Sequence, residues 1–282
     1  MKKKRPKTLM AIDHPDLLLD LLCSKNEYRG RADFRKQLSD LHGINLKQKS
    51  KTDQMYLNML TALNLLENKK SQNISIYKKT LIANQICKER KNPNKEIYRK
   101  TLQSVLLESE YTKPFFNKLI EILNKGMKNH LPINSNDLVW MKVFSNETLR
   151  TLKALGKEAG LIEERDGCLI VIKSELKSLD FKKFKEEVFH VYNSIIEQQR
   201  NQGVYTRTTH ARISEVRKNV CILNRISLAE FDEQFKKLLS SPEGRKIEIF
   251  GAAPQYLPDK KDPNFENFIF MHNRKIYVFM TI

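Results

Sequence analysis

One pattern occurs more than once in this chain: an apolar repeat with helical spacing, then a short polar turn, then an alternating strand. In the clearest copy, the apolar residues from Leu149 to Leu161 have helical spacing, Asp166-Gly167 form the turn, and Leu169 lies in the return strand. Asp-Gly between apolar runs is a strong hairpin signal, because both residues tolerate a positive φ. The pattern predicts a mainly α fold with small β-hairpins, in the α+β class.

The same pattern divides the chain into segments. In the first segment a helix is predicted over 53–67, followed by a polar turn and a strand over 74–77. In the last, helices are predicted over 181–199, 209–220 and 228–239. The predicted organisation is a basic tail (1–11), a first unit (12–80), a helical connector (81–110), a second unit (111–178) and a third unit with a long connection before its last strand (179–282).

The charge of the chain predicts a polyanionic partner. It has 51 Lys and Arg against 33 Asp and Glu, a formal net charge of +18. Charge alone does not separate DNA from RNA or from an anionic membrane. A lysine-rich surface that reflects an AT-rich genome is the alternative interpretation. Since the chain has neither a run of about 18 apolar residues nor a signal-peptide core, we expect no membrane span and a cytoplasmic location.

Three helices closed by a β-hairpin resemble the winged-helix superfamily, over the whole third unit and also in the first two. Tandem winged helices occur in DNA-recognition regions of some restriction endonucleases, in plasmid replication initiators and in transcriptional regulators. The resemblance implies tandem winged-helix domains joined by helices, with double-stranded DNA as partner. The expected function is non-catalytic DNA binding, as a regulator or as the recognition component of a restriction or antiviral defence complex.

The resemblance also implies where DNA would lie, because the third helix of a winged helix usually enters the major groove and the wing reaches phosphates. In the second unit, Asn146 would read adenine and Arg150 guanine, while Lys153 and Lys157 would contact phosphates. In the first unit, basic residues near Tyr28 and on the wing would bind the backbone. The predicted contacts of these two units are Arg29, Arg31, Lys69, Lys70, Asn146, Arg150, Lys153 and Lys157.

The third unit departs from this docking. Its third helix starts with Glu230, Asp232 and Glu233, which suit a helix N-terminus but repel phosphate. Either the basic segment over 206–218 contacts DNA instead, or this unit docks a partner protein. The predicted DNA contacts here are Arg207, Arg212 and Arg217. A scaffold whose winged helices bind partner chains is therefore an alternative function.

No catalytic or cofactor motif stands out. The tripeptides Glu175-Leu-Lys177 and Asp180-Phe-Lys182 match part of a nuclease motif, but they fall in a loop and at a helix start. A phosphate-binding glycine loop is lacking, and the six histidines have no regular ligand spacing. We predict no enzyme activity, cofactor or metal; a nuclease assembled from scattered acids remains an alternative. The four cysteines are predicted to be reduced, Trp140 to lie in the core, and Gly126 to end a helix.

Overall fold

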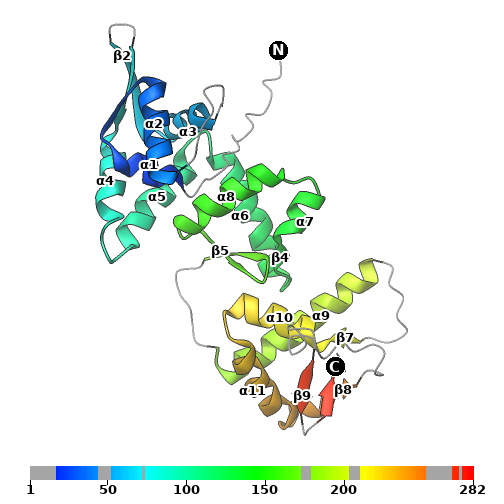
Figure 1. The fold of residues 1–282 in the computed structure, drawn as a ribbon. Helices are drawn as coiled ribbons and strands as arrows, with labels where there is room; N and C mark the ends of the chain where they lie inside the picture. Colours follow the sequence, from blue (N-terminus) through cyan, green and yellow to red (C-terminus); the bar gives the residue numbers. More distant parts are fainter. Residues whose placement is uncertain are drawn as a thin grey trace. The chain divides into compact units, whose positions relative to one another are not determined.

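The computed structural model describes residues 17–43, 52–71, 74–172, 179–202, 210–251, 269–272 and 275–282. It confirms the coarse fold class, since the chain is mainly helical with small antiparallel sheets (Figure 1). The described residues fall into two compact units, drawn from 1–122 with 135–164 and from 123–134 with 165–282. The predicted domain boundaries stay predictions, and the whole predicted basic tail lies outside the described residues.

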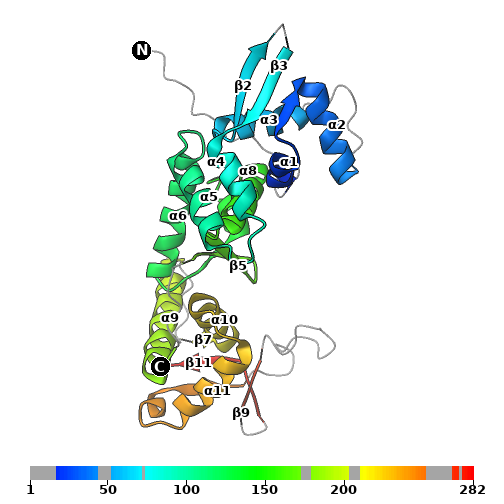
Figure 2. The same cartoon turned by 90° about the vertical axis from the view of Figure 1, so that its left-hand side faces the viewer.

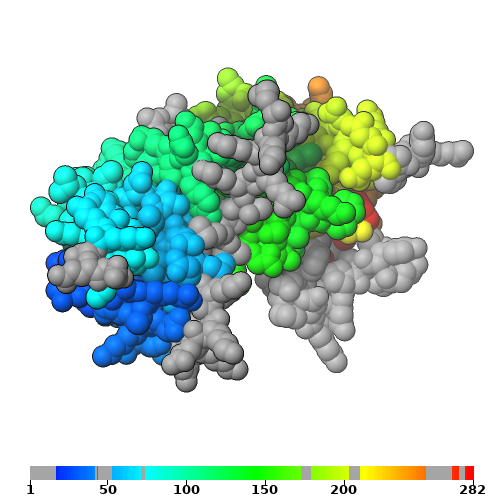
Figure 3. All heavy atoms as spheres, turned by 90° about the horizontal axis from the view of Figure 1, so that it is seen from above, coloured from blue at the N-terminus to red at the C-terminus, as the bar shows by residue number. Residues whose placement is uncertain are grey.

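The first repeat, residues 18–79, combines three helices with a three-stranded antiparallel sheet. Its elements are α1 (Leu18–Ser24), β1 (Glu27–Arg29), α2 (Gly30–His42), α3 (Thr52–Ala62), β2 (Leu66–Ser71) and β3 (Ile74–Lys79). The strand order is β1-β3-β2, with Tyr28 opposite Tyr77 and Lys69 opposite Ile76. The β2–β3 ribbon extends beyond the helices (Figure 2), and the repeat forms one continuous surface, blue to cyan in Figure 3.

Helix α3 is shorter than the predicted helix over 53–67. It ends at Ala62, and Asn64 takes a left-handed conformation (φ 56°), which asparagine tolerates better than most residues. Leu66 then opens strand β2 instead of extending the helix. Its side chain is only 2% exposed in the strand. The apolar spacing therefore could not separate a helix from a strand at Leu66, because this side chain is buried in both.

Two helices follow the first repeat, as predicted for the connector. They are α4 (Leu81–Glu89) and α5 (Glu96–Glu108). The break between them includes Asn92-Pro93-Asn94, where the sequence predicts an interruption of the helical pattern. The Thr80 hydroxyl accepts a hydrogen bond from the Ala83 amide and so caps α4.

The prediction of four reduced cysteines is wrong for two of them. Cys23, in α1, and Cys87, in α4, form a disulfide with a Cα–Cα distance of 5.2 Å. The two residues are 64 positions apart, so only the packing of α1 against α4 brings them together. Cys168 and Cys221 are free and buried.

The second repeat, residues 113–171, has the same succession of elements. They are α6 (Lys113–Lys128), β4 (Ile133–Asn134), α7 (Ser135–Trp140), α8 (Asn146–Glu158), β5 (Ile162–Arg165) and β6 (Cys168–Val171). The strand order is β4-β6-β5. The predicted Asp-Gly turn is confirmed: Asp166 (φ 47°) and Gly167 (φ 75°) both have the positive φ that a tight hairpin requires.

Gly126 does not end its helix, contrary to the prediction. Helix α6 continues through it to Lys128. A Cβ atom at this position would lie 2.7 Å from the Leu131 carbonyl oxygen and 2.7 Å from Cγ1 of Ile133. The glycine is therefore needed for the close return of the chain into β4. Gly126 does not make the turn itself. The chain reverses only after Lys128, where His130 has a φ of 55°. The role of Gly126 is therefore close packing.

Trp140 is exposed, which corrects its assignment to the core. The apolar spacing over 135–144 predicts one helix, but α7 ends at Trp140, and Lys142 turns the chain with a φ of 56°. Leu138 and Phe144 remain buried, whereas Trp140 is 85% exposed. The shorter helix separates Trp140 from the apolar face that its spacing had suggested.

The third repeat, residues 181–281, again has this succession. Its elements are α9 (Phe181–Asn201), β7 (Ala211–Arg212), α10 (Ile213–Asn224), α11 (Leu228–Leu239), the 3₁₀ turn η2 (Glu243–Lys246), β8 (Glu248–Phe250), β9 (Phe270–His272), β10 (Lys275–Tyr277) and β11 (Phe279–Thr281). One sheet has the order β7-β11-β8, while β9 and β10 pair separately. The core is aromatic and aliphatic and includes Phe184, Phe231, Phe235 and Phe270.

Two predictions for the third repeat need correction. Helix α10 begins at Ile213, four residues later than predicted, because residues 211–212 pair with β11 as strand β7. The apolar spacing of the predicted helix over 181–199 puts Phe181 on one stripe with Phe184 and Val188, but Phe181 is 37% exposed at the first position of α9. Most of the long connection before β11 lies outside the described residues.

The first two repeats share one order: helix, short strand, two helices and two strands. The third repeat has the same order in its main sheet, with η2 and the separate β9–β10 pair inserted before the last strand. In each main sheet the last strand lies between the other two. Among the helices described, none combines the length and the hydropathy that crossing a membrane requires.

Candidate nucleic-acid interface

Helix α8 is positioned by a defined cap and a buried stripe. The Ser145 hydroxyl accepts a hydrogen bond from the Thr148 amide at 3.2 Å, which satisfies one free donor at the helix start. Leu149, Leu152 and Leu155 are buried on one face. Their spacing leaves the opposite face polar. This face carries the four contacts predicted for the second repeat.

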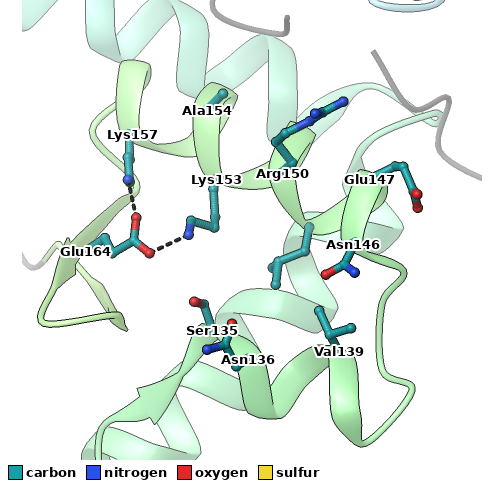
Figure 4. Close-up of a pocket in the computed structure, with 11 residues that line it drawn as sticks. Ser135, Asn136, Val139, Asn146, Glu147, Arg150, Lys153, Ala154, Lys157 and Glu164 are labelled. Atoms are coloured by element: carbon teal, nitrogen blue, oxygen red, sulfur yellow. Dashed lines mark hydrogen bonds and ion pairs between the residues drawn. The ribbon is translucent and has the colours of Figure 1, made fainter. Parts of the chain in front are cut away.

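The four predicted residues line one groove of about 620 Å³ between α7 and α8 (Figure 4). Ser135, Asn136 and Val139 line it from α7, and Glu164 lines it from β5. The remaining lining residues come from α8. They are Asn146, Glu147, Leu149, Arg150, Lys153, Ala154 and Lys157.

Glu164 holds both lysines of the groove. Its two carboxylate oxygens form separate ion pairs with Lys153 and Lys157 (Figure 4). Burial by itself raises the pKa of Glu164, but the hydrogen bonds and charges of the two lysines outweigh it and lower the pKa below its ordinary value. The carboxylate therefore stays charged near neutral pH. A phosphate that binds either lysine must compete with Glu164.

Arg150 lies apart from this cluster. It is exposed and extends away from Lys153 in Figure 4. The pKa of Glu147 is lowered, first by a hydrogen bond from its own backbone amide, then by the Ser145 hydroxyl and by the charge of Arg150. Lysine and arginine side chains give the groove three positive charges, and Glu147 and Glu164 give two negative ones, so its net charge is +1.

In the first repeat, the predicted contacts separate into exposed and structural residues. Arg29, Lys69 and Lys70 are exposed at the sheet. Lys69 lies 3.4 Å from Glu67, an exposed pair that contributes little to stability.

Arg31 is held by a buried carboxylate. Its Nε lies 2.6 Å and its Nη2 2.8 Å from the carboxylate of Asp53, whose side chain is fully buried. Arg35 pairs with the same carboxylate at 3.1 Å. A buried carboxylate is tolerated only when such partners compensate its desolvation. The ion pair with Asp53 explains the position of Arg31. We therefore no longer count Arg31 among the predicted DNA contacts.

Among the described residues of the third repeat, one predicted DNA contact is exposed to solvent. Arg207 lies outside the described residues, and Arg212 is exposed in β7. Arg217 is only 3% exposed and forms an ion pair with Asp232 at 3.1 Å. The prediction of Arg217 as a DNA contact is therefore withdrawn, because its guanidinium is buried against α11.

Sequence reasoning missed Glu164 as a member of the site. The sequence holds one signal for it. Lys153 and Lys157 are one helical turn apart, and Glu164 follows in the strand that returns beside them, so an ion pair with both lysines could have been predicted. The possible nuclease tripeptide at Asp180 has a different role. Its carboxylate accepts a hydrogen bond from the Lys183 amide at 2.8 Å and caps α9. Residues 175–177 lie outside the described residues.

No protein-family model, curated protein or solved structure matches this chain.

Proposed function

We propose that this chain is a non-catalytic DNA-binding protein built of tandem winged helices. Its role is that of a regulator or of the DNA-recognition component of a restriction or antiviral defence complex. The observation that carries the proposal is the groove of the second repeat, which Asn146, Arg150, Lys153 and Lys157 line from one face of α8. The element order shared by the three repeats supports it, since a winged helix has this order and this central third strand.

In this proposal α8 enters the major groove. Asn and Arg make bidentate contacts to adenine and guanine there, so Asn146 and Arg150 are assigned to base edges. Lys153 and Lys157 are assigned to phosphates, which replace Glu164 as their partner. Trp140 follows the groove residue Val139 in sequence and supplies an exposed aromatic ring to the same repeat.

A binding titration with labelled nucleic acids tests the proposal. Duplex DNA, single-stranded DNA and RNA of equal length are compared at two salt concentrations. We expect duplex DNA to bind best, because the proposal assigns α8 to a major groove, which only the DNA duplex offers at the required width. Equal affinity for all three, or affinity only for RNA, would contradict the assignment of DNA as partner.

Charge reversal at the groove separates DNA binding from a function as a protein-interaction scaffold. Arg150→Glu with Lys153→Glu should abolish duplex binding, because both cations line the groove. The matched control is Lys182→Glu with Lys236→Glu, which changes the net charge equally at two exposed lysines of the third repeat. Loss of binding in both double variants would point to unspecific attraction by the net charge.

A protein-interaction scaffold is the second candidate function. The start of α11 favours it in the third repeat, because Glu230 and Glu233 are exposed there and Asp232 holds the buried Arg217. Under this function the groove variant would retain all of the nucleic-acid affinity that the wild type has. Incubation of pure protein and DNA with Mg²⁺ or Mn²⁺ tests the third alternative, a nuclease; cleavage would overturn the non-enzyme proposal.

We place the protein in the cytoplasm as part of the same proposal. Disulfides are rare in the cytosol, so the Cys23–Cys87 bond is an observation against this location. Alkylation of both thiols in intact cells before isolation would support the location, and a disulfide in protein treated in this way would contradict it.

A further inference from the structure

Three potential metal ligands from two segments that are remote in sequence meet near the end of α6. They are His130, in the turn between α6 and β4, and Glu187 and His190 on α9. Nδ1 of His130 lies 3.1 Å from Oε2 of Glu187, and the two imidazole rings are 4.7 Å apart between centroids. One ligand atom from each residue lies within 4.8 Å of the other two.

The backbone fixes all three positions. His130 has a φ of 55°, and its amide donates to the Met127 carbonyl at 3.2 Å, while the next residue, Leu131, packs against the third-repeat core. Glu187 and His190 are one turn apart on α9, whose buried residues include Val188 and Val191. The ligands therefore come from well-packed elements, and only side-chain rotation is needed to adjust them.

We propose that His130, Glu187 and His190 bind a divalent transition-metal ion of the Zn²⁺ class. Ligand atoms that bind zinc at about 2.1 Å in a tetrahedron lie roughly 3.4 Å apart. The distance between His130 and Glu187 already matches this spacing. His190 must move its ligand atom inward by roughly 1.4 Å at most. Its side chain is exposed, so this movement displaces no core residue.

The chemistry of the ligands selects the metal. Two imidazoles with one carboxylate suit Zn²⁺, Co²⁺ or Ni²⁺, whereas Mg²⁺ and Ca²⁺ prefer oxygen ligands alone. Three protein ligands leave a fourth tetrahedral position for water or for a ligand from outside the cluster. The bound ion would join the turn after α6 to α9. This inference is independent of the proposed DNA binding.

The alternative is a simple hydrogen bond between His130 and Glu187, with His190 as a neighbour. The two interpretations differ at His190. Only the metal site requires its imidazole, whereas the hydrogen bond remains complete without it.

Isothermal titration of the full-length, chelator-treated protein with ZnCl₂ in excess Mg²⁺ tests the proposal. We expect one bound zinc ion per chain and a higher melting temperature of the loaded protein, because the ion binds only the folded arrangement. His190→Ala and Glu187→Gln should each weaken zinc affinity by at least about tenfold. Glu186→Gln is the matched control, since Glu186 is the exposed neighbour of Glu187 in the same helix.

Circular dichroism of each variant without metal verifies the fold. His190 is exposed, so its replacement leaves the core intact. Absence of 1:1 zinc binding by the wild type would overturn the proposal. Unchanged zinc affinity in folded His190→Ala or Glu187→Gln would also overturn it, as would an equal loss in Glu186→Gln.

Discussion

At the scale of single residues, the acids decide which cations are available. Asp53 is buried and holds Arg31 and Arg35, and Glu164 holds Lys153 and Lys157. These cations look alike in the sequence. Arg31 and Arg35 neutralise a buried carboxylate of the first repeat. Lys153 and Lys157 line an open groove, where a stronger anion can replace Glu164.

Removing Asp53 should destabilise the first repeat. Asp53→Ala leaves two arginines without their buried partner, and we expect the free energy of unfolding to fall by about 2–3 kcal/mol, because both guanidiniums still reach water. Chemical denaturation monitored by circular dichroism measures this change. Asp40→Ala, at an exposed position of α2, is the control and should leave stability unchanged.

The same carboxylate predicts the pH dependence of stability. Burial raises the pKa of Asp53, but Arg31 and Arg35 together lower it below its ordinary value of 3.8. Since the folded pKa lies below the unfolded one, the stabilisation is complete above pH 3.8 and is lost as the pH falls through the folded pKa. The stability difference between wild type and Asp53→Ala should therefore shrink only below that pH. A difference that shrinks already between pH 5 and 7 would contradict this account.

Neutralising Glu164 should strengthen DNA binding. Glu164→Gln releases Lys153 and Lys157 for phosphates, and we expect a three- to tenfold higher affinity for duplex DNA, or roughly 1 kcal/mol. Fluorescence anisotropy at constant salt measures it. Glu121→Gln, at an exposed position of α6, makes the same change of charge elsewhere. An equal gain in both variants would show that only the net charge matters.

At the scale of elements, close packing sets the path of the chain after α6. Gly126→Ala should lower the free energy of unfolding by about 1–3 kcal/mol, because the new Cβ overlaps the Leu131 carbonyl and Ile133. Thermal unfolding of the variant checks this. Lys125→Ala is the matched control on the same helix and should have little effect, since Lys125 is exposed. A stability gain in Gly126→Ala would contradict the packing described.

The disulfide joins two elements of the first compact unit. Its loop of 64 residues predicts a contribution of up to about 4 kcal/mol from the restricted unfolded chain. Cys23→Ser with Cys87→Ser should therefore lower the melting temperature, and a reductant should lower it in the wild type alone. Cys221 is no competing partner, because burial raises its pKa to about 12 and keeps its thiol protonated. A reductant effect of equal size in the double variant would sink this prediction.

At the scale of the whole molecule, the net charge of +18 predicts salt-sensitive binding. Without Arg31, six predicted cations of the first two repeats remain, namely Arg29, Lys69, Lys70, Arg150, Lys153 and Lys157. If about six phosphates are neutralised, log affinity should fall against log salt with a slope near −5. Titrations between low and moderate salt measure the slope. A slope near zero would reject an electrostatic interface.

The sequence predicted those parts of the fold and site that depend on neighbouring residues. Asp166-Gly167 determined a hairpin because both residues accept a positive φ, and Ser145 determined the start of α8 because its hydroxyl caps the helix. The apolar stripe of α8 also determined which face stays polar. The position of Asn146, Arg150, Lys153 and Lys157 along one groove follows from this spacing.

Only the tertiary structure decided the contacts between residues that are distant in the chain. The Cys23–Cys87 bond, the pairing of Arg217 with Asp232, and the meeting of His130 with Glu187 depend on helix packing, which residue spacing does not encode. Burial also depends on where an element ends, and this exposes Trp140. Local propensities are short-range, whereas burial and charge pairing depend on the whole arrangement of elements.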